Sequence, residues 1–472
     1  MLRYRVCILD YQGVIMSDLK IKKKSNETDM TVGNPTKHIL LFALPLFIGN
    51  MFQQLYNTID TVVVGKYVSA DALAATGNCG SLNFLFFSLS SGLAIGIGII
   101  VSQYYGAKDT DGVKNTIANS VYILVAASLV ATTLGIIFAK PLLRLMSTPE
   151  EILNLAALYL RTTCCGITFI ALYNGVASAL RALGDSKTPL YFLIMSSFLN
   201  IGFDLLFVLG FNMGVFGVAF ATVIAQFIAA AVSIIYAVIK VPYFKLSKEE
   251  MKPNKEIIVK SFKLGVPMAL QSSMIAISMT VIQSVVNSFG TIVMAAYTIS
   301  CKVDLITSQL YGALSMALVT YAGQNLGADK INRIKQGYIR GLIIVTVYNM
   351  VVIPIIYIFS TQINAFFVKD TSVIEFGAKA LQINVLFYFV LAFIYIPRGI
   401  LNGCGDSRFS LINGITEVAC RIIYVSILTK ISGIGMWGIW WATGATWFTV
   451  ALVCNTRYWI GGWKKLKPAG QR

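Results

Sequence analysis

Long, nearly uncharged apolar segments recur from residue 39 to residue 460, and they constrain the fold more than any other feature. A helix that crosses a bilayer needs about 20 predominantly apolar residues. Charged residues make up only 12% of this 472-residue chain, compared with about 25% in soluble domains. The sequence therefore predicts an all-α integral membrane protein with twelve transmembrane helices, and it excludes a soluble core, a disordered chain and a secreted disulfide scaffold. The expected segments are 39–64, 82–104, 117–140, 157–180, 189–211, 214–240, 258–287, 293–321, 338–360, 376–402, 409–430 and 436–460.

Positive charge is distributed unevenly between the predicted loops. Lys and Arg collect in the loops that follow an even number of helices, as shown by Lys114, Lys187 and Lys335. Positively charged loops are retained on the cytoplasmic side of a membrane. We therefore expect a multi-pass protein of the cell membrane with both termini in the cytoplasm. The same rule accounts for the formal net charge of +17, so no nucleic-acid partner is expected.

Similar motifs recur at almost one offset, which indicates an internal repeat. R-A-L-G-D-S at 181–186 resembles N-G-C-G-D-S at 402–407, an offset of 221. Six helices in each half give both halves the same membrane orientation, as in transporters built from parallel repeats. The predicted division is a cytoplasmic N-terminal tail (1–37), an N-lobe with helices 1–6 (38–240), a cytoplasmic inter-lobe linker (241–257), a C-lobe with helices 7–12 (258–460) and a cytoplasmic C-terminal tail (461–472).

The N-terminal tail has no helical periodicity, and it contains a cluster of lysines rather than a signal-peptide core. Met30 lies shortly before the first helix, so the sequence leaves open whether residues 1–29 are translated. We expect their removal to leave folding and transport nearly unchanged.

The sequence offers no recognisable catalytic site. His38 is the only histidine, the 8 cysteines form no C-x-x-C pair, and no G-x-x-x-x-G-K-[ST] motif is present. We therefore expect no enzyme activity, no catalytic residue, no resident metal and no cofactor, and we interpret the cysteines as small apolar packing residues.

The repeated motifs resemble those of the multidrug and toxic compound extrusion (MATE) family, within the MOP flippase superfamily. The resemblance covers about residues 34 to 460 and rests on N-P-x-x-x-I-L-x-F-A-L-P (34–45), I-D-T-V-V-V-G (59–65), the Gln-x-x-Gly-Ala turns (103–107 and 324–328) and the doubled G-D-S turns (184–186 and 405–407). It implies two six-helix lobes around a V-shaped cavity, related by a pseudo-twofold axis. It also implies export of small organic cations or amphiphilic drugs by alternating access, driven by inward H⁺ or Na⁺, with the lipid bilayer as surroundings and a monomer as the working unit. A lipid or lipid-linked saccharide flippase of the same superfamily is the alternative, although such flippases often have 14 helices and a cationic cavity.

Ionisable groups inside a membrane are costly, so they are functional candidates. Asp60 lies in the first helix, with Tyr56 at i−4 and Gln53 at i−7 on the same face. Asn200 and Asp204 share a face of the fifth helix, four residues apart. Asp60 is alternatively an interfacial acid, because the helix is expected to end soon after it.

The resemblance assigns a cation-coupling role to four of these polar side chains. Asp60, Asn200, Asp204 and Thr222 match the proposed N-lobe cation site of the family. Carboxylate, amide and hydroxyl oxygens are the ligands that hard cations prefer, and burial of a carboxyl group favours its protonated form. The sequence therefore supports a cation site without choosing between H⁺ and Na⁺. The candidates for the adjoining substrate cavity are Tyr56, Gln53, Asn174 and Gln271.

The C-lobe lacks this acidic set. At the offset of the repeat, Asp60 corresponds to Val281, and Asn200 corresponds to Arg421. Glu417 and Arg421 are spaced i, i+4 in the eleventh predicted helix, which favours an intrahelical ion pair, although a gating or substrate contact is an alternative. The charges with a possible gating or structural role are Asp304, Arg398, Glu417 and Arg421.

Overall fold

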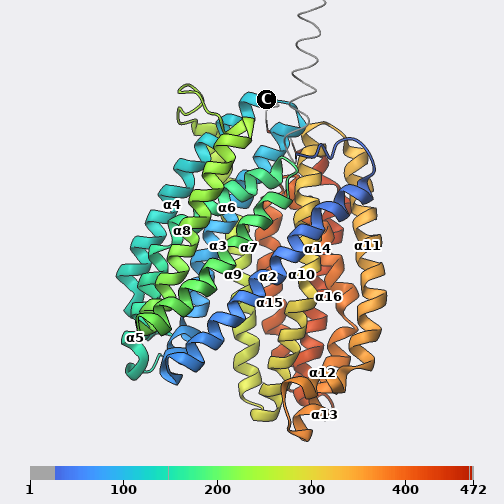
Figure 1. The fold of residues 1–472 in the computed structure, drawn as a ribbon. Coiled ribbons are helices and arrows are strands. Elements are labelled where there is room, and N and C mark those ends of the chain that lie inside the picture. Colours follow the sequence, from blue (N-terminus) through green and yellow to red (C-terminus); the bar gives the residue numbers. More distant parts are fainter. Residues whose placement is uncertain (1–26, 147, 467, 470–472) are drawn as a thin grey trace, which may run out of the picture.

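The computed structural model describes residues 27–146, 148–466 and 468–469, and within them the chain is helical without a β-strand (Figure 1). The first half contains α2 (Pro35–Tyr67), α3 (Ala70–Gly106), α4 (Thr110–Leu145), α5 (Glu150–Cys165), α6 (Ile167–Ala182), α7 (Lys187–Leu205) and α8 (Gly214–Lys240). The second half contains α9 (Lys255–Asn287), α10 (Thr291–Gly327), α11 (Ile331–Ile358), α12 (Ser360–Phe367), α13 (Thr371–Val385), α14 (Tyr388–Gly403), α15 (Ser407–Leu428) and α16 (Gly438–Ile460). Short non-α turns are η1 (Leu206–Gly210), η2 (Pro242–Phe244), η3 (Gly435–Trp437) and η4 (Gly462–Lys465).

The helices account for twelve spans. Nine helices of the described residues are long and apolar enough to cross a membrane, and two bent pairs raise that number to 11. The bent pairs are α5 with α6 (41°) and α13 with α14 (44°). Of the two remaining helices, α12 has only 8 residues. The other, α16, has 23 residues, about 35 Å at 1.5 Å per residue, and packs against α14 and α15. The predicted twelve-helix fold class is thus confirmed.

Several helices differ from the predicted segments. The helix α3 begins at Ala70 rather than at residue 82, because Ser69 caps its first turn by accepting a hydrogen bond from the Ala72 N–H. The segments 157–180 and 376–402 were predicted as single helices, but each is broken in the middle, at Gly166 and at Leu386–Phe387. Gly166 and Phe387 are equivalent positions of the repeat, so both halves bend at the same point.

The first helix of each half begins in the same way. Asn34 and Asn254 are the N-cap residues of α2 and α9, and each accepts hydrogen bonds from two backbone N–H groups of the first turn. Both helices also contain an internal proline, Pro45 in α2 and Pro267 in α9, at corresponding places in the two halves. The repeat therefore extends from the motifs to the capping of the helices.

The two halves meet mainly along two helices of the first half. The central helix α3 packs against both α9 and α10, and α2 packs against α10 as well as against α7 of its own half. Figure 1 shows α4, α5 and α8 on one flank of the molecule and α11, α12 and α13 on the other. The inter-lobe contact is thus made mainly by α2, α3, α9 and α10.

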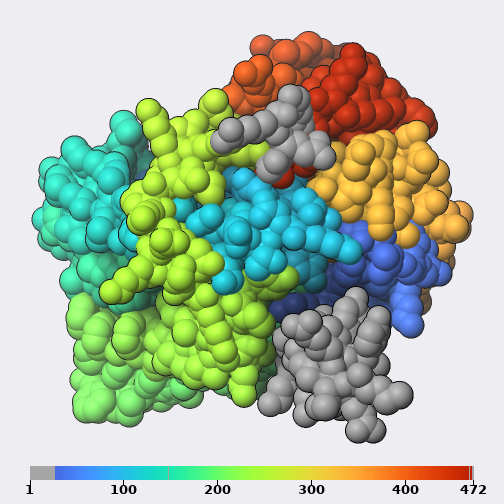
Figure 2. All heavy atoms as spheres, turned by 90° about the horizontal axis from the view of Figure 1, so that it is seen from above, coloured from blue at the N-terminus to red at the C-terminus, as the bar shows by residue number. Residues whose placement is uncertain are grey.

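Both ends of the described chain lie on the same face of the bundle, at the top of Figure 1, which we call the terminal face. Figure 2 looks onto this face, where the α8–α9 linker lies beside the α3–α4 turn. The linker is fixed to α4: Lys114 Nζ lies 3.0 Å from Glu250 Oε1, and the Tyr122 hydroxyl donates to the Met251 carbonyl at 3.0 Å. Hydrogen bonds from the Ser247 N–H and then from Lys114 hold the pKa of Glu250 below its ordinary value.

The predicted N-terminal tail is only partly a tail. Residues 1–26 lie outside the described residues, but α2 already begins at Pro35, ahead of the predicted lobe boundary at residue 38. Residues 28–33 are packed against the helices, and Met30 is only 1% exposed. The chain is thus irregular over residues 27–34, as expected, and becomes helical at Pro35, three residues before the predicted boundary.

Candidate functional site

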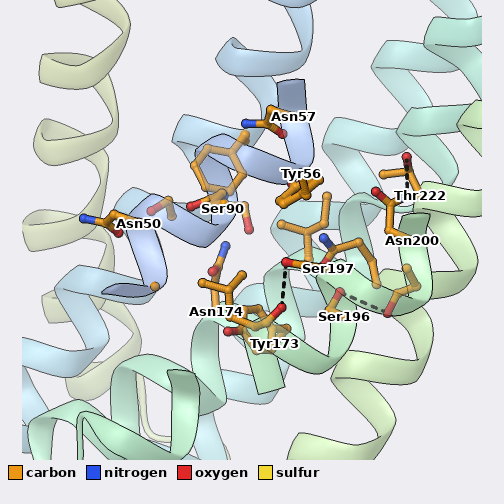
Figure 3. Close-up of a pocket in the computed structure, with 18 of the residues that line it drawn as sticks. Asn50, Tyr56, Asn57, Ser90, Tyr173, Asn174, Ser196, Ser197, Asn200 and Thr222 are labelled. Atoms are coloured by element: carbon orange, nitrogen blue, oxygen red, sulfur yellow. Dashed lines mark hydrogen bonds between the residues drawn. The ribbon is translucent and has the colours of Figure 1, made fainter. Parts of the chain in front are cut away.

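A cavity of about 780 Å³ lies mainly within the first half of the molecule. Its walls come from α2, α3 and α5–α8, and Leu305 and Met316 of α10 complete it from the second half. The lining is rich in amide, hydroxyl and phenol groups. Figure 3 shows such side chains gathered around the space, namely Asn50, Tyr56, Asn57, Ser90, Tyr173, Asn174, Ser196, Ser197, Asn200 and Thr222.

The structure brings together the four residues predicted to bind a cation. Asp60 and Thr222 line the cavity with Asn200, and Asp204 lies behind them with none of its surface exposed. Asn200 and Asp204 share a face of α7, one turn apart, as their spacing predicts. The Asn200 amide nitrogen donates to the Thr222 hydroxyl oxygen at 3.4 Å, and the hydroxyl donates to the Val218 carbonyl at 3.2 Å. The amide nitrogen is thus occupied, and the Asn200 side-chain carbonyl oxygen is left buried without a partner among the described residues.

Four oxygens of this group are buried without a hydrogen-bond partner among the described residues: Asp60 Oδ1, Asn200 Oδ1, Asp204 Oδ1 and Asp204 Oδ2. Each of the two carboxyl groups has the other as its acidic neighbour, and neither forms an ion pair with a described Lys or Arg. Unpartnered buried oxygens are costly, and two adjacent carboxylates cannot both remain charged without a counterion. A shared proton would join one oxygen of each carboxyl group, whereas a small bound cation could be ligated by all four oxygens.

A local irregularity of the backbone follows this site, and the sequence did not predict it. Directly after Asp204 and Leu205, the helix α7 continues as the π-helical turn η1. Such turns are rare and often lie at functional sites, because they redirect side chains on either side. Gly202 is the only glycine or proline in the two turns before η1, so the sequence carries little signal for the π-helical turn.

Three of the four predicted cavity residues line the cavity, namely Gln53, Tyr56 and Asn174. Asn174 carries a buried amide nitrogen with no partner among the described residues, so it can donate to a ligand. The prediction was wrong for Gln271, which is 5% exposed and donates to Asn413 Oδ1 at 3.0 Å. Its helix α9 packs closely on α15, which turns Gln271 away from the cavity and into the C-lobe.

The C-lobe charges form a separate buried network. Glu417 lies 3.3 Å from Arg421 and 3.6 Å from Arg398, so the predicted i, i+4 pair is present and is extended by a second arginine. Arg398 also donates to Asn413 Oδ1 at 2.6 Å. None of these side chains is among the residues that line the described cavity. This placement favours the structural interpretation of the pair over a substrate contact.

Asp304 is held by neutral donors. Its Oδ1 accepts hydrogen bonds from the Asn384 amide at 2.7 Å and from the Tyr388 hydroxyl at 2.6 Å. The nearby Lys302 does not pair with it, because Lys302 Nζ lies over the Phe367 ring at 5.3 Å. Asp304 too is therefore part of the packing of the C-lobe.

Comparisons with known proteins agree with this architecture. The family model MatE matches the chain twice, over residues 45–206 and 267–427. The chain belongs to the MATE family. The two matches start 222 residues apart (267 − 45) and end 221 residues apart (427 − 206), which agrees with the offset of 221 between the repeated motifs. The MATE family consists of membrane transporters.

Related proteins and solved structures cover nearly the whole chain. The probable multidrug resistance protein YpnP of Bacillus subtilis is 30% identical over 93% of this chain and 98% of its own length. The probable multidrug resistance protein YoeA of the same organism is 28% identical over 90% of this chain and 93% of its own. A multidrug resistance MATE transporter in an outward-facing conformation superimposes with a TM-score of 0.87 at 22% identity, covering 94% of this chain and 99% of that one. This last similarity shows the fold.

One cavity residue of this MATE transporter escaped the sequence analysis. Arg181, in the last turn of α6, lines the cavity, although the charge pattern placed it in a loop. Its Nε is buried without a partner, and it forms no ion pair with a described acidic side chain. Asp60 and Arg181 are the two charged side chains in the described lining. The available signal was the position of Arg181 inside the repeated motif, three residues before Gly184 of the G-D-S turn.

Proposed function

We propose that the protein exports organic cations or amphiphilic drugs in exchange for inward H⁺ or Na⁺. The observation that carries the proposal is the group of four unpartnered oxygens of Asp60, Asn200 and Asp204 beside the cavity. A cation bound there lies next to the space where a substrate would bind, so each alters the affinity of the other, and that coupling is reciprocal. The probable multidrug resistance proteins YpnP and YoeA, which match almost end to end, support the class of substrate.

Dye efflux from proteoliposomes tests this proposal. The vesicles are loaded with ethidium, and a Na⁺ gradient and a pH gradient are imposed separately. Efflux is expected to follow one of the two gradients and to stop when that gradient is dissipated. Equal ethidium release with no gradient would contradict ion-coupled export.

The terminal face is expected to be cytoplasmic. The lysine-containing α8–α9 linker and both ends of the described chain lie on this face, and positive loops stay in the cytoplasm. In a variant without native cysteines, Lys252→Cys should react with an impermeant maleimide only in inside-out vesicles. Lys369→Cys, an exposed position between α12 and α13, is the matched control and should react only in intact cells. The reverse pattern would overturn the orientation.

The alternative, a flippase for lipid-linked saccharides, has one observation in its favour. Arg181 offers a positive charge to an anionic headgroup. A diphosphate carries more negative charge than a single arginine balances, and Asp60 in the same lining would repel it. The lining therefore favours an organic cation or a neutral amphiphile over a diphosphate-linked lipid.

A further inference from the structure

The ends of α3 and α10 approach each other very closely at the terminal face. A Cβ atom added to Gly106 would overlap the Gln324 carbonyl group, and one added to Gly327 would overlap the Gln103 carbonyl group. No side chain fits at either place unless the two helices separate. The backbones of the two lobes are thus in direct contact here, with glycine required on both sides.

Two buried glutamines connect the lobes at this contact. Gln103 of α3 is 2% exposed, and Gln324 of α10 is fully buried. The Gln103 side-chain amide donates to the Gly403 carbonyl at 3.2 Å, and that of Gln324 donates to the Ala182 carbonyl at 2.8 Å. Each bond joins a helix end of one lobe to a helix end of the other. The two donors are equivalent positions of the repeat, and so are the two acceptors, which means that one contact is made twice.

The side-chain oxygen of each glutamine is occupied by a terminal segment of the chain. Gln324 Oε1 accepts a hydrogen bond from the Met30 N–H at 2.9 Å, and Gln103 Oε1 accepts one from the Ala469 N–H at 2.9 Å. Ala469 is 1% exposed and packs with Ile99 and Val319 in an apolar cluster that both lobes share. Both donors lie outside the residues that match the family model, 45–206 and 267–427.

Residues 28–33, which we call the N-terminal strap, contact both lobes. On the first lobe, the Thr28 N–H donates to the Leu183 carbonyl at 3.3 Å. On the second lobe, Arg333 donates to the Met30 carbonyl at 3.0 Å and to the Gly33 carbonyl at 3.0 Å. Lys330 Nζ donates to the Thr31 carbonyl at 2.9 Å. The strap therefore crosses the seam between the lobes instead of lying on one of them.

We propose that Gln103 and Gln324, together with the strap and Ala469, form a double latch that holds the terminal face closed. The lobes cannot separate there without breaking both amide–carbonyl bonds. The strap bonds to both lobes, and Ala469 follows the C-lobe but bonds to Gln103 of the N-lobe, so separation also breaks bonds made by both terminal segments. The donors and acceptors of these bonds are buried, so each must form a hydrogen bond with water when the face opens, or opening costs the free energy of an unsatisfied polar group. Release of the two terminal segments is thus a step in opening this face. The latch rests on the proposed alternating access, but its closure is measurable without transport.

The reporter for closure is Val319→Cys in a chain whose native cysteines have been replaced. Val319 is 7% exposed and packs between the lobes just inside the latch, so its thiol reacts with a maleimide only when the terminal face opens. Gln324→Ala and Gln103→Ala are each expected to raise the labelling rate about tenfold, the effect of roughly one lost buried interaction. Removal of residues 1–33 should do the same, because it removes the Met30 N–H group that donates to Gln324 Oε1.

Two further variants keep the test decisive. Ala469→Pro removes the N–H group that donates to Gln103 Oε1 while keeping both glutamines, and it should raise labelling by a smaller factor. Asn349→Ala is the matched control, since Asn349 is equally buried but bonds only within the C-lobe, to Tyr311 and Tyr388. It should leave labelling unchanged even if it lowers the melting temperature.

The outcomes separate the latch from the proposed function. The latch is supported if labelling is faster in the glutamine variants and in Ala469→Pro but unchanged in Asn349→Ala. This conclusion holds even if ethidium is never exported. Unchanged labelling in Ala469→Pro and in the folded glutamine variants overturns the latch, whatever the efflux assay shows. Equal acceleration in Asn349→Ala also overturns it, because the effect is then one of general loosening.

Discussion

Asp60→Asn is expected to abolish gradient-driven ethidium efflux while the protein still folds. The amide has the shape of the protonated carboxyl group, so packing at the half-buried position is preserved. The side chain can no longer release a proton or carry the charge that holds Na⁺. Substrate affinity should therefore lose its dependence on pH or Na⁺, a coupling that is typically about 5–150-fold where two sites are linked. Ethidium binding to purified protein, titrated at several pH values and Na⁺ concentrations, measures this loss directly.

Two related variants define how specific this effect is. Asp204→Asn should weaken coupling less if Asp204 mainly tunes its neighbour from behind the cavity wall. Val281→Asn places the same amide at the equivalent position of the other lobe and should leave the ion dependence intact. Wild-type efflux by Asp60→Asn, with unchanged ion dependence, would exclude the N-lobe site and direct attention to Asp304 and Glu417.

Glu417→Gln is expected to produce the largest loss of stability, about 3–5 kcal/mol. Glu417 lies between Arg398 and Arg421, whose side chains are 11% and 4% exposed, so the variant leaves two buried guanidinium groups with no anion beside them. Arg421→Met should be milder, because Arg398 still balances Glu417. The double variant Glu417→Met, Arg421→Met should recover part of the loss. Thermal unfolding in one detergent measures all three.

An exposed ion pair serves as the control for this series. Arg144 and Glu150 lie 2.9 Å apart with side chains 61% and 70% exposed, and exposed pairs contribute little. Glu150→Gln should therefore leave the melting temperature nearly unchanged. A double variant at Glu417 and Arg421 that is stable but inactive would instead assign the pair a role in transport.

The sequence predicted the fold well because a membrane imposes simple rules. Apolar length, Lys and Arg bias and the internal repeat together determine the spans and the two halves. Hydropathy does not register a helix that continues into polar residues, so the Ala70 start of α3 was missed. It also does not register a break inside an apolar segment, such as the one at Gly166, because the residues on both sides remain apolar.

The site was predictable where helix spacing decides which side chains share a face. Asn200 and Asp204 needed only the i, i+4 rule, and their approach to Asp60 followed from the family resemblance. Gln271 failed because its direction depends on how α9 packs against α15, which spacing within one helix does not determine. Arg181 was missed because a positive charge near a helix end has the same pattern whether it faces water or a cavity.

The strap was beyond sequence analysis for a different reason. Met30 and Gln324 are 294 positions apart, and nothing in the irregular segment before α2 indicates that the Met30 N–H group becomes buried. Such a contact is specified by the partner surface, which exists only after both lobes have folded.

The reciprocal glutamine contacts have a consequence for how this architecture is assembled. Gln103 bonds to Gly403, and its repeat equivalent Gln324 bonds to Ala182, the repeat equivalent of Gly403. In a twofold symmetric dimer, residue i of one copy contacts residue j of the other, and residue j of the first contacts residue i of the second. The two glutamine contacts follow this rule. Two copies of a single six-helix chain would already possess this contact. In one polypeptide, the two halves can differ in the residues that face their interiors, as they do at the equivalent positions Asp60 and Val281. The glutamine contact that joins the halves nevertheless keeps the symmetry of a homodimer.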